Sequence, residues 1–218
     1  MYSVKEIFYT LQGEGAQTGR PALFLRFAGC NLWSGREADR QAAICSFCDT
    51  DFVGTDGENG GQFKSATALA ARAVEVALGL CAEDALDKSV NGLQIVLTGG
   101  EPLLQVDSAL IDALHERGFF IAVETNGTIK APSGLDWVCV SPKLGSEVVQ
   151  RSGDELKVVY GQDGLNPEEF LSWDFTHFYL QPMDCSDIDQ LTMAVIEYCK
   201  AHPRWKLSLQ SHKILQIP

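Results

Sequence analysis

Short apolar stretches alternate with amphipathic helical patterns along this chain, and this alternation limits its fold more than any other feature. Residues 94–98 (QIVLT) and 156–160 (LKVVY) have the length and apolar content of strands that are buried on both faces. Residues 105–118 (QVDSALIDALHERG) show the apolar spacing of a helix and end at a glycine, a common helix terminator. Buried strands that alternate with helices predict an α/β fold with a mostly parallel sheet.

The remaining elements follow the same alternation. Further strands are predicted at 6–11, 22–28, 119–125, 136–141, 177–181 and 206–210. Further helices are predicted at 65–81 (N-cap Ser65; Leu69, Ala73, Ala77 and Leu80 on one face), near 166–173 and at 187–202. A complete (β/α)8 barrel usually takes about 250 residues, whereas this chain has 218. We therefore predict an incomplete β/α barrel with about six parallel strands and about three main helices, in a single domain over residues 1–218.

Glycine, proline and small polar residues follow five of the predicted strands. These positions are Cys30, 99–102 (GGEP), 124–127 (ETNG), 141–143 (SPK) and 181–184 (QPMD). Ligands of such folds bind where loops leave the carboxyl ends of the strands. Any one of these clusters alone is equally well explained as a turn, because turns use the same residues. Five of them together favour one shared pocket.

Composition narrows the class of protein. The chain has 17 basic and 29 acidic residues, a net charge of −12, so direct binding to nucleic-acid phosphates is not expected. The longest apolar runs fall short of the ~20 residues that a membrane span needs. The first residues, MYSVKEIFYT, lack the features of a signal peptide. We therefore expect a cytoplasmic protein with reduced thiols, in which clustered cysteines indicate metal binding or catalysis.

Three of the seven cysteines lie between residues 30 and 50. Cys45 and Cys48 have CxxC spacing, and Cys30 precedes them by a long interval. A structural zinc site needs a fourth ligand, and the four histidines are all remote in sequence. A [4Fe–4S] cluster on three thiolates instead leaves one iron open to another ligand. Zinc, unrelated buried cysteines and an open cluster all remain as interpretations, of which the last explains the missing fourth cysteine.

The cysteine pattern resembles the cluster motif of the radical S-adenosylmethionine superfamily, usually CxxxCxxC with an aromatic residue at the position of Phe47. This chain departs from it by the insertion 31–44, which can loop out because the cost of loop closure grows slowly with length. Residues 99–102 are similar to the GGEP element of the superfamily, whose backbone receives the methionyl amino group. The resemblance implies a [4Fe–4S] cluster that binds S-adenosylmethionine at its open iron and cleaves it to a 5′-deoxyadenosyl radical.

A longer set of motifs, in a fixed order along the chain, narrows the resemblance to one family of this superfamily. LQGEG at 11–15, TGGEP, TNG, SPK, QPMD and the final HKILQIP occur in an order that closely resembles the 7-carboxy-7-deazaguanine synthase family, from Gln12 to Pro218. The resemblance implies a lyase that converts 6-carboxy-5,6,7,8-tetrahydropterin to 7-carboxy-7-deazaguanine with loss of ammonia. This step lies on the route to queuosine, a tRNA modification. It also implies Mg²⁺, a flavodoxin-type or similar electron donor and a homodimer.

The resemblance assigns roles to matching positions. The cluster ligands would be Cys30, Cys45 and Cys48. S-adenosylmethionine would be bound by Phe47, Cys48, Asp49, Gly100, Ser141, Pro142, Lys143, Gln181, Pro182, Met183 and Asp184. The pterin would be bound by Leu11, Gln12, Gly13, Glu14, Arg26, Thr98 and Pro218. Thr50 would bind Mg²⁺ together with the substrate carboxylate.

Plainer interpretations stand beside these roles. Arg26 offers a forked donor set for a carboxylate, but a strand arginine can also simply extend to solvent. Glu14 can cap a turn, and Thr50 has the residue type of a helix N-cap. The other cysteines, Cys81, Cys139, Cys185 and Cys199, are interpreted as core or incidental residues.

Two rival functions fit parts of the pattern. A glycyl-radical activating enzyme shares the cluster motif and short length, but it acts on a protein and has no need for LQGEG or the HKILQIP ending. A zinc-stabilised binding module without turnover would use the same cysteines. Iron and zinc content separates the cluster from the second of these rivals.

Overall fold

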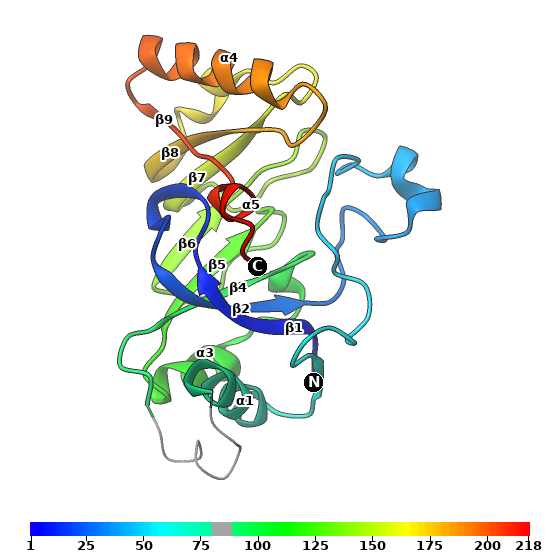
Figure 1. Cartoon of the computed structure of the whole chain (residues 1–218), viewed down its shortest axis with the longest axis vertical. Helices are drawn as coiled ribbons and strands as arrows, with labels where there is room; N and C mark the ends of the chain where they lie inside the picture. The colour runs from blue at the N-terminus through cyan, green and yellow to red at the C-terminus, as the bar shows by residue number, and fades with distance from the viewer. Residues whose placement is uncertain (80–88) are drawn as a thin grey trace.

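A single open sheet organises the protein, whose computed structural model describes residues 1–79 and 89–218. Within them the strands are β1 (Tyr2–Leu11), β2 (Pro21–Phe27), β3 (Gly61–Phe63), β4 (Gln94–Gly99), β5 (Phe120–Thr125), β6 (Trp137–Val140), β7 (Ser152–Tyr160), β8 (Asp174–Pro182) and β9 (Trp205–Leu207). Their spatial order is β3-β1-β2-β4-β5-β6-β7-β8-β9 (Figure 1). All neighbours from β2 to β9 pair in parallel, whereas β1 and β3 are antiparallel. The sheet does not close, so the predicted incomplete barrel is confirmed.

The three longer helices of the described residues cover one face of the sheet. The α-helices are α1 (Ala66–Leu78), α3 (Ser108–Glu116), α4 (Ile188–Ala201) and α5 (Ser211–Leu215), and short 3-10 helices lie at Gly15–Gln17, Glu37–Ala42, Pro102–Leu104 and Pro167–Phe170. α1 and α3 pack beside the β1, β2, β4 and β5 part of the sheet, and α4 lies over β8 and β9 (Figure 1). No helix among the described residues has the length and apolar content that crossing a membrane needs.

The first helix shows how local sequence sets an element's ends. The Ser65 hydroxyl accepts a hydrogen bond from the Ala68 amide (3.1 Å), so the predicted N-cap is confirmed. Gly79 ends α1 in the left-handed conformation at φ +62°. The predicted extension to residue 81, including Leu80 and Cys81, lies outside the described residues.

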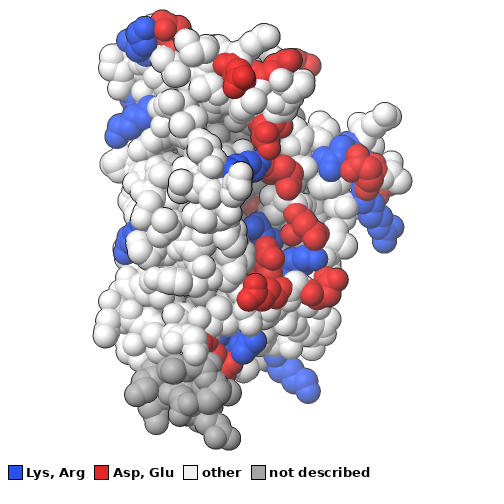
Figure 2. All heavy atoms as spheres, viewed as in Figure 1, with Lys and Arg blue, Asp and Glu red and all other residues white. Residues whose placement is uncertain are grey.

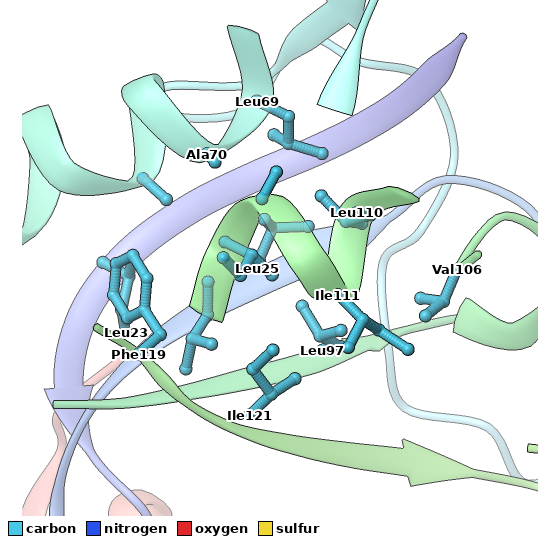
Figure 3. Packing of buried hydrophobic residues seen from close by; sticks show 14 of the residues in the cluster. Leu23, Leu25, Leu69, Ala70, Leu97, Val106, Leu110, Ile111, Phe119 and Ile121 are labelled. Atoms are coloured by element: carbon cyan, nitrogen blue, oxygen red, sulfur yellow. The ribbon is translucent and has the colours of Figure 1, made fainter. Parts of the chain in front are cut away.

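The apolar core lies between this helical layer and the sheet. Leu97 and Ile121 on neighbouring parallel strands face Leu110 and Ile111 of α3, and Leu69 of α1 closes the cluster (Figure 3). These side chains are about 0–1% exposed. Their burial fixes the helix-covered face of the sheet, so the opposite face of the sheet can carry polar groups.

The opposite face of the sheet carries the polar side chains. Strand side chains alternate between faces, so Arg26, Thr98 and Lys157 project away from the helical layer. Register places Arg26 of β2 beside Thr98 of β4. It also aligns Glu124 of β5 with Cys139 of β6, and Cys139 with Glu155 of β7. A row of polar groups therefore crosses the inner face of the half-barrel.

Candidate active site

One cavity of about 410 Å³ opens at the carboxyl ends of the parallel strands. It is lined by every residue that the sequence assigns to a cluster, cofactor, magnesium or pterin site except Pro142. Pro142 is buried between Ser141 and Lys143, which do line the cavity. The five strand-end clusters therefore share one site, as parallel strand polarity predicts.

The three cysteines meet on one side of this cavity. Cys30 follows β2, and Cys45 and Cys48 return to it across the insertion. The Leu32 amide donates to Cys30 Sγ (3.4 Å). A hydrogen bond from the Cys45 thiol lowers the pKa of Cys48 to about 6, and the same contact, with burial, raises the pKa of Cys45. Cys30 is therefore close to Cys45 and Cys48 in space, although it is distant from them in sequence.

The chemistry of this donor set, three cysteine thiols in one cavity wall, fits an iron–sulfur cluster. Among the described residues, no group of three or more His, Cys, Asp or Glu could hold one metal ion. A Cβ on Gly100 would collide with the Gly29 carbonyl and the Cys30 Cβ. The chain therefore wraps closely around the cysteines, in a space that only glycine allows.

The insertion 31–44 is folded onto the cysteine loop rather than free of it. It projects from the body of the protein and contains the 3-10 helix Glu37–Ala42 (Figure 1). The Arg40 guanidinium donates to the Ser46 and Cys48 carbonyls, both at 2.9 Å. It also lies 4.2 Å from the Trp33 ring centroid. An arginine of the insertion therefore holds the backbone of the CxxC turn.

Glu101, the acid of GGEP, ties three strand ends together. It is 0% exposed, and its carboxylate accepts from the Leu103 amide (2.9 Å), the Thr125 hydroxyl (2.8 Å) and the Asn126 amide (2.8 Å). The Glu101 amide donates to the Gly29 carbonyl (3.0 Å). Burial raises the pKa of Glu101, and these hydrogen bonds oppose that rise. Glu101 is thus a structural tie beneath the cavity.

Lys143 points its charge toward the cysteines from the end of β6. Its Nζ donates to the carbonyl and hydroxyl oxygens of Ser141, both at 2.7 Å. Burial lowers the pKa of Lys143, and the Cys45 and Cys48 thiols oppose that change. A cation at this place balances negative charge brought by cysteine thiolates.

Arg26 lines the other side of the cavity. Its Nε donates to Glu6 (2.8 Å), a partner that the sequence pattern did not reveal. The two terminal guanidinium nitrogens have no hydrogen-bond partner among the described residues. Arg26 is therefore held in place inside the cavity rather than extended to solvent.

The C-terminal segment covers the cavity from the strand-end side, where α5 lies over the sheet (Figure 1). The Gly13 carbonyl accepts from the Ser211 amide (3.0 Å) and hydroxyl (2.9 Å). A Cβ on Gly13 would collide with His212. Pro218 lines the cavity, and its carbonyl oxygen accepts from the Thr10 hydroxyl (3.1 Å). Sequence patterning missed α5, which is too short for a periodic signal.

Ion pairs fix the rim of the cavity. Lys213 of α5 bridges Asp49 (2.5 Å) and Asp184 (2.6 Å), which come from the cysteine loop and from the loop after β8. Lys5 pairs with Asp51 at 3.0 Å. Figure 2 shows acidic side chains gathered in the middle of this face, with basic ones among them, beside the projecting insertion.

Thr50 does not cap a helix, so that interpretation is wrong. No helix begins there, and the residue lines the cavity next to the cysteines. Its amide supports the Cys48 sulfur by a hydrogen bond. A hydroxyl in the cavity wall is compatible with a magnesium ion that takes most of its ligands from water and substrate.

Sequence patterning also missed Lys157, which sits at the floor of the cavity. Its Nζ lies 2.7 Å from Glu14 Oε2 and 2.9 Å from Glu124 Oε2. Gln181 and Gln210 donate to Glu14 Oε1 at 3.1 and 2.9 Å. The sequence does contain a signal for this residue: Lys157 stands inside an apolar strand, whose flanking residues predict that the lysine is buried.

Protein stability is expected to fall as the pH drops below about 5, in part because Glu14 becomes protonated. Burial alone would raise the pKa of Glu14, but the charge and hydrogen bond of Lys157 lower it from 4.5 to about 2. Its contribution to stability is therefore present above pH 4.5 and lost as the pH falls through about 2. The contribution is on the order of 3 kcal/mol, since one pKa unit is worth about 1.4 kcal/mol.

Urea unfolding of the iron-free protein measures this effect. The free energy of unfolding of the wild type should exceed that of Glu14→Gln most at neutral pH, and the difference should shrink as the solution is acidified. A difference that stays constant down to the acid limit of folding would contradict the assignment.

Comparison with known proteins identifies the family to which the chain belongs. No protein-family model matches it. It is 60% identical to the 7-carboxy-7-deazaguanine synthase of Caulobacter vibrioides (100% of this chain, 99% of the relative) and 61% identical to that of Bradyrhizobium diazoefficiens (99% of each). The structure is similar to the crystal structure of QueE from Escherichia coli, with a TM-score of 0.65 and 29% identity over 97% of this chain and 94% of that one. At this identity over the whole length, the chain belongs to the 7-carboxy-7-deazaguanine synthase family.

Proposed function

We propose that this enzyme converts 6-carboxy-5,6,7,8-tetrahydropterin to 7-carboxy-7-deazaguanine, releasing ammonia, in the biosynthesis of queuosine and related 7-deazapurines. The observation that carries the proposal is one cavity with three cysteines on one side and a set of carboxylates, amides and Arg26 on the other. When bound, a [4Fe–4S] cluster and S-adenosylmethionine supply the radical that takes a hydrogen atom from the substrate. Side chains of this protein would bind and orient the substrate and S-adenosylmethionine.

The cofactor end would be held by residues around the cysteines. Cys30, Cys45 and Cys48 would hold the cluster, and the Gly100 backbone, which lies against Cys30 and lines the cavity, would receive the methionyl amino group. Ser141 and Lys143, held together by two hydrogen bonds, would face S-adenosylmethionine from the end of β6. Residues 181–184 after β8 would complete this side.

The substrate end would recognise charge at one side and ring donors at the other. The terminal nitrogens of Arg26 would bind the substrate carboxylate as a fork, with Thr50 and Mg²⁺ on its other side. The Glu14 carboxylate would accept from the N–H groups of the aminopyrimidinone ring. Thr98, beside Arg26 in the sheet register, would contact the pterin body.

The electron donor, the oligomeric state and the cellular location are proposed from the resemblance to the family. We propose a flavodoxin-type electron donor, a homodimer and a cytoplasmic site of action. The net charge of −12 favours a small-molecule enzyme over a tRNA-binding one.

The function is tested with anaerobically reconstituted enzyme, dithionite, S-adenosylmethionine, Mg²⁺ and 6-carboxy-5,6,7,8-tetrahydropterin. The expected product is 7-carboxy-7-deazaguanine, detected by mass spectrometry together with released ammonia. Cleavage of S-adenosylmethionine without a ring-contracted product would overturn the substrate but keep the radical chemistry. A protein that binds stoichiometric zinc and no iron would overturn both.

A further inference from the structure

A buried lysine and two carboxylates form a compact triad at the floor of the cavity. Lys157 is 5% exposed at its side chain, and Glu14 and Glu124 are 18% and 20% exposed. All three line the cavity. Lys157 lies on β7, Glu14 in the loop after β1, and Glu124 on β5, so three distant parts of the chain meet here. A lysine is almost never buried without partners, because removing its charge from water is costly.

The groups around Lys157 make the local charge negative. They are Glu14 after β1, Glu124 on β5, Cys139 on β6, Glu155 on β7, Lys143 after β6 and His212 on α5. Lys157 Nζ contacts two of them as an ion pair, Glu14 and Glu124. With Lys157 charged, these two carboxylates and the lysine carry a net charge of −1.

The two carboxylates keep acceptor capacity that faces the cavity. An ionised carboxylate offers about four acceptor sites. Glu14 uses three of them, for Lys157, Gln181 and Gln210. Glu124 accepts from Lys157 (2.9 Å), from the Cys139 thiol and, at a long 3.4 Å, from Gln12. The unused sites are of one kind, hydrogen-bond acceptors, so they suit the N–H groups of an aminopyrimidinone ring.

We propose that Lys157 is a positioning residue, which keeps Glu14 and Glu124 ionised and fixed so that both accept hydrogen bonds from the N–H groups of the substrate ring. The inference rests on the proposed function. Without Lys157, two carboxylates would face each other in a poorly solvated place, and one of them would take up a proton. A protonated carboxyl group is itself a donor, so it would oppose the donor edge of the ring.

The titration of the triad supports this role. Burial would raise the pKa of Glu14, and Lys157 provides the first of the interactions that lower it to about 2. Burial would lower the pKa of Lys157, but Glu124 and Glu14 raise it well above its ordinary value. The neighbouring Glu155 has no such partner at ion-pair distance in the described part of the chain, and burial raises its pKa to about 7. Lys157 thus lies between Glu14, whose pKa is low, and Glu155, which holds its proton more tightly.

Equilibrium binding of the fluorescent analogue 6-carboxypterin tests the role. The reconstituted holoenzyme with S-adenosylmethionine is titrated between pH 6 and pH 8.5 as wild type, as Lys157→Met and as Lys206→Met. Lys206, on β9 at the edge of the sheet, is exposed and serves as the matched control. We expect Lys157→Met to weaken binding about tenfold at pH 6 and to recover toward the wild-type Kd as the pH rises. Lys206→Met should match the wild type at every pH.

The ratio of variant to wild-type Kd decides the outcome, because it removes titrations that both proteins share. A ratio near one at pH 6, or a raised ratio that does not change with pH, would overturn the positioning role. If Lys157→Met does not fold, Lys157→Met/Glu124→Gln is compared with Glu124→Gln, a pair that differs only in the lysine. A fall of the ratio with pH is expected there too, because burial raises the pKa of the remaining Glu14 once the lysine is gone, and a flat ratio overturns the role. A wild type that binds no pterin would instead refute the proposed function.

Discussion

Replacing Cys45 by alanine is expected to abolish cluster assembly as completely as replacing Cys48. The two thiols form one hydrogen-bonded pair in the cavity, with Cys30 beside them, so each would supply one of the three proposed iron ligands. Two thiolates cannot hold a cluster that already has an open iron. The measurement is iron content and visible absorbance after anaerobic reconstitution, where the wild type should hold about four irons per chain.

Cys199→Ala provides the matched control. This cysteine lies in α4, packed against the apolar cluster under β8, and it does not line the cavity. It should leave the iron content unchanged. A full complement of iron in Cys45→Ala would contradict the assignment and would show that the insertion does not return a ligand to Cys30.

Chain direction explains why the location of the site was predictable. Parallel strands place all their carboxyl ends at one edge, so Gly100 after β4 and Ser141 after β6 had to lie together once both strands were recognised. Both do line the cavity. The same reasoning carries no information about a side chain's direction, and Pro142, between two lining residues, points into the protein instead.

Long-range pairing explains what remained hidden. Glu14 and Lys157 lie on strand ends that only the completed sheet brings together, and no local pattern links them. Arg26 was predicted from its residue type, but its partner Glu6 depends on the antiparallel register of β1 and β2. Short elements such as β3 and α5 are formed by tertiary contacts rather than by periodicity, so a sequence pattern does not reveal them.

Replacing Glu101 by glutamine is expected to lower the free energy of unfolding by about 3 kcal/mol. One carboxylate oxygen accepts from Leu103 and Thr125, and the amide oxygen of glutamine can keep this role. The other oxygen accepts from the Asn126 amide. In the variant an NH₂ group would face that N–H, leaving two buried donors opposed and unsatisfied.

The loss should extend to the cluster, because the Glu101 side chain holds in place the backbone whose amide donates to the Gly29 carbonyl, next to Cys30. Urea unfolding of the iron-free protein and iron content after reconstitution are the two measurements. Glu116→Gln, an exposed change at the end of α3, is the matched control and should alter stability by no more than about 0.5 kcal/mol. An equally stable Glu101→Gln protein would mean that the three strand ends hold their places without the buried carboxylate. In that case the geometry around Gly100 would have to come from the glycine backbone alone.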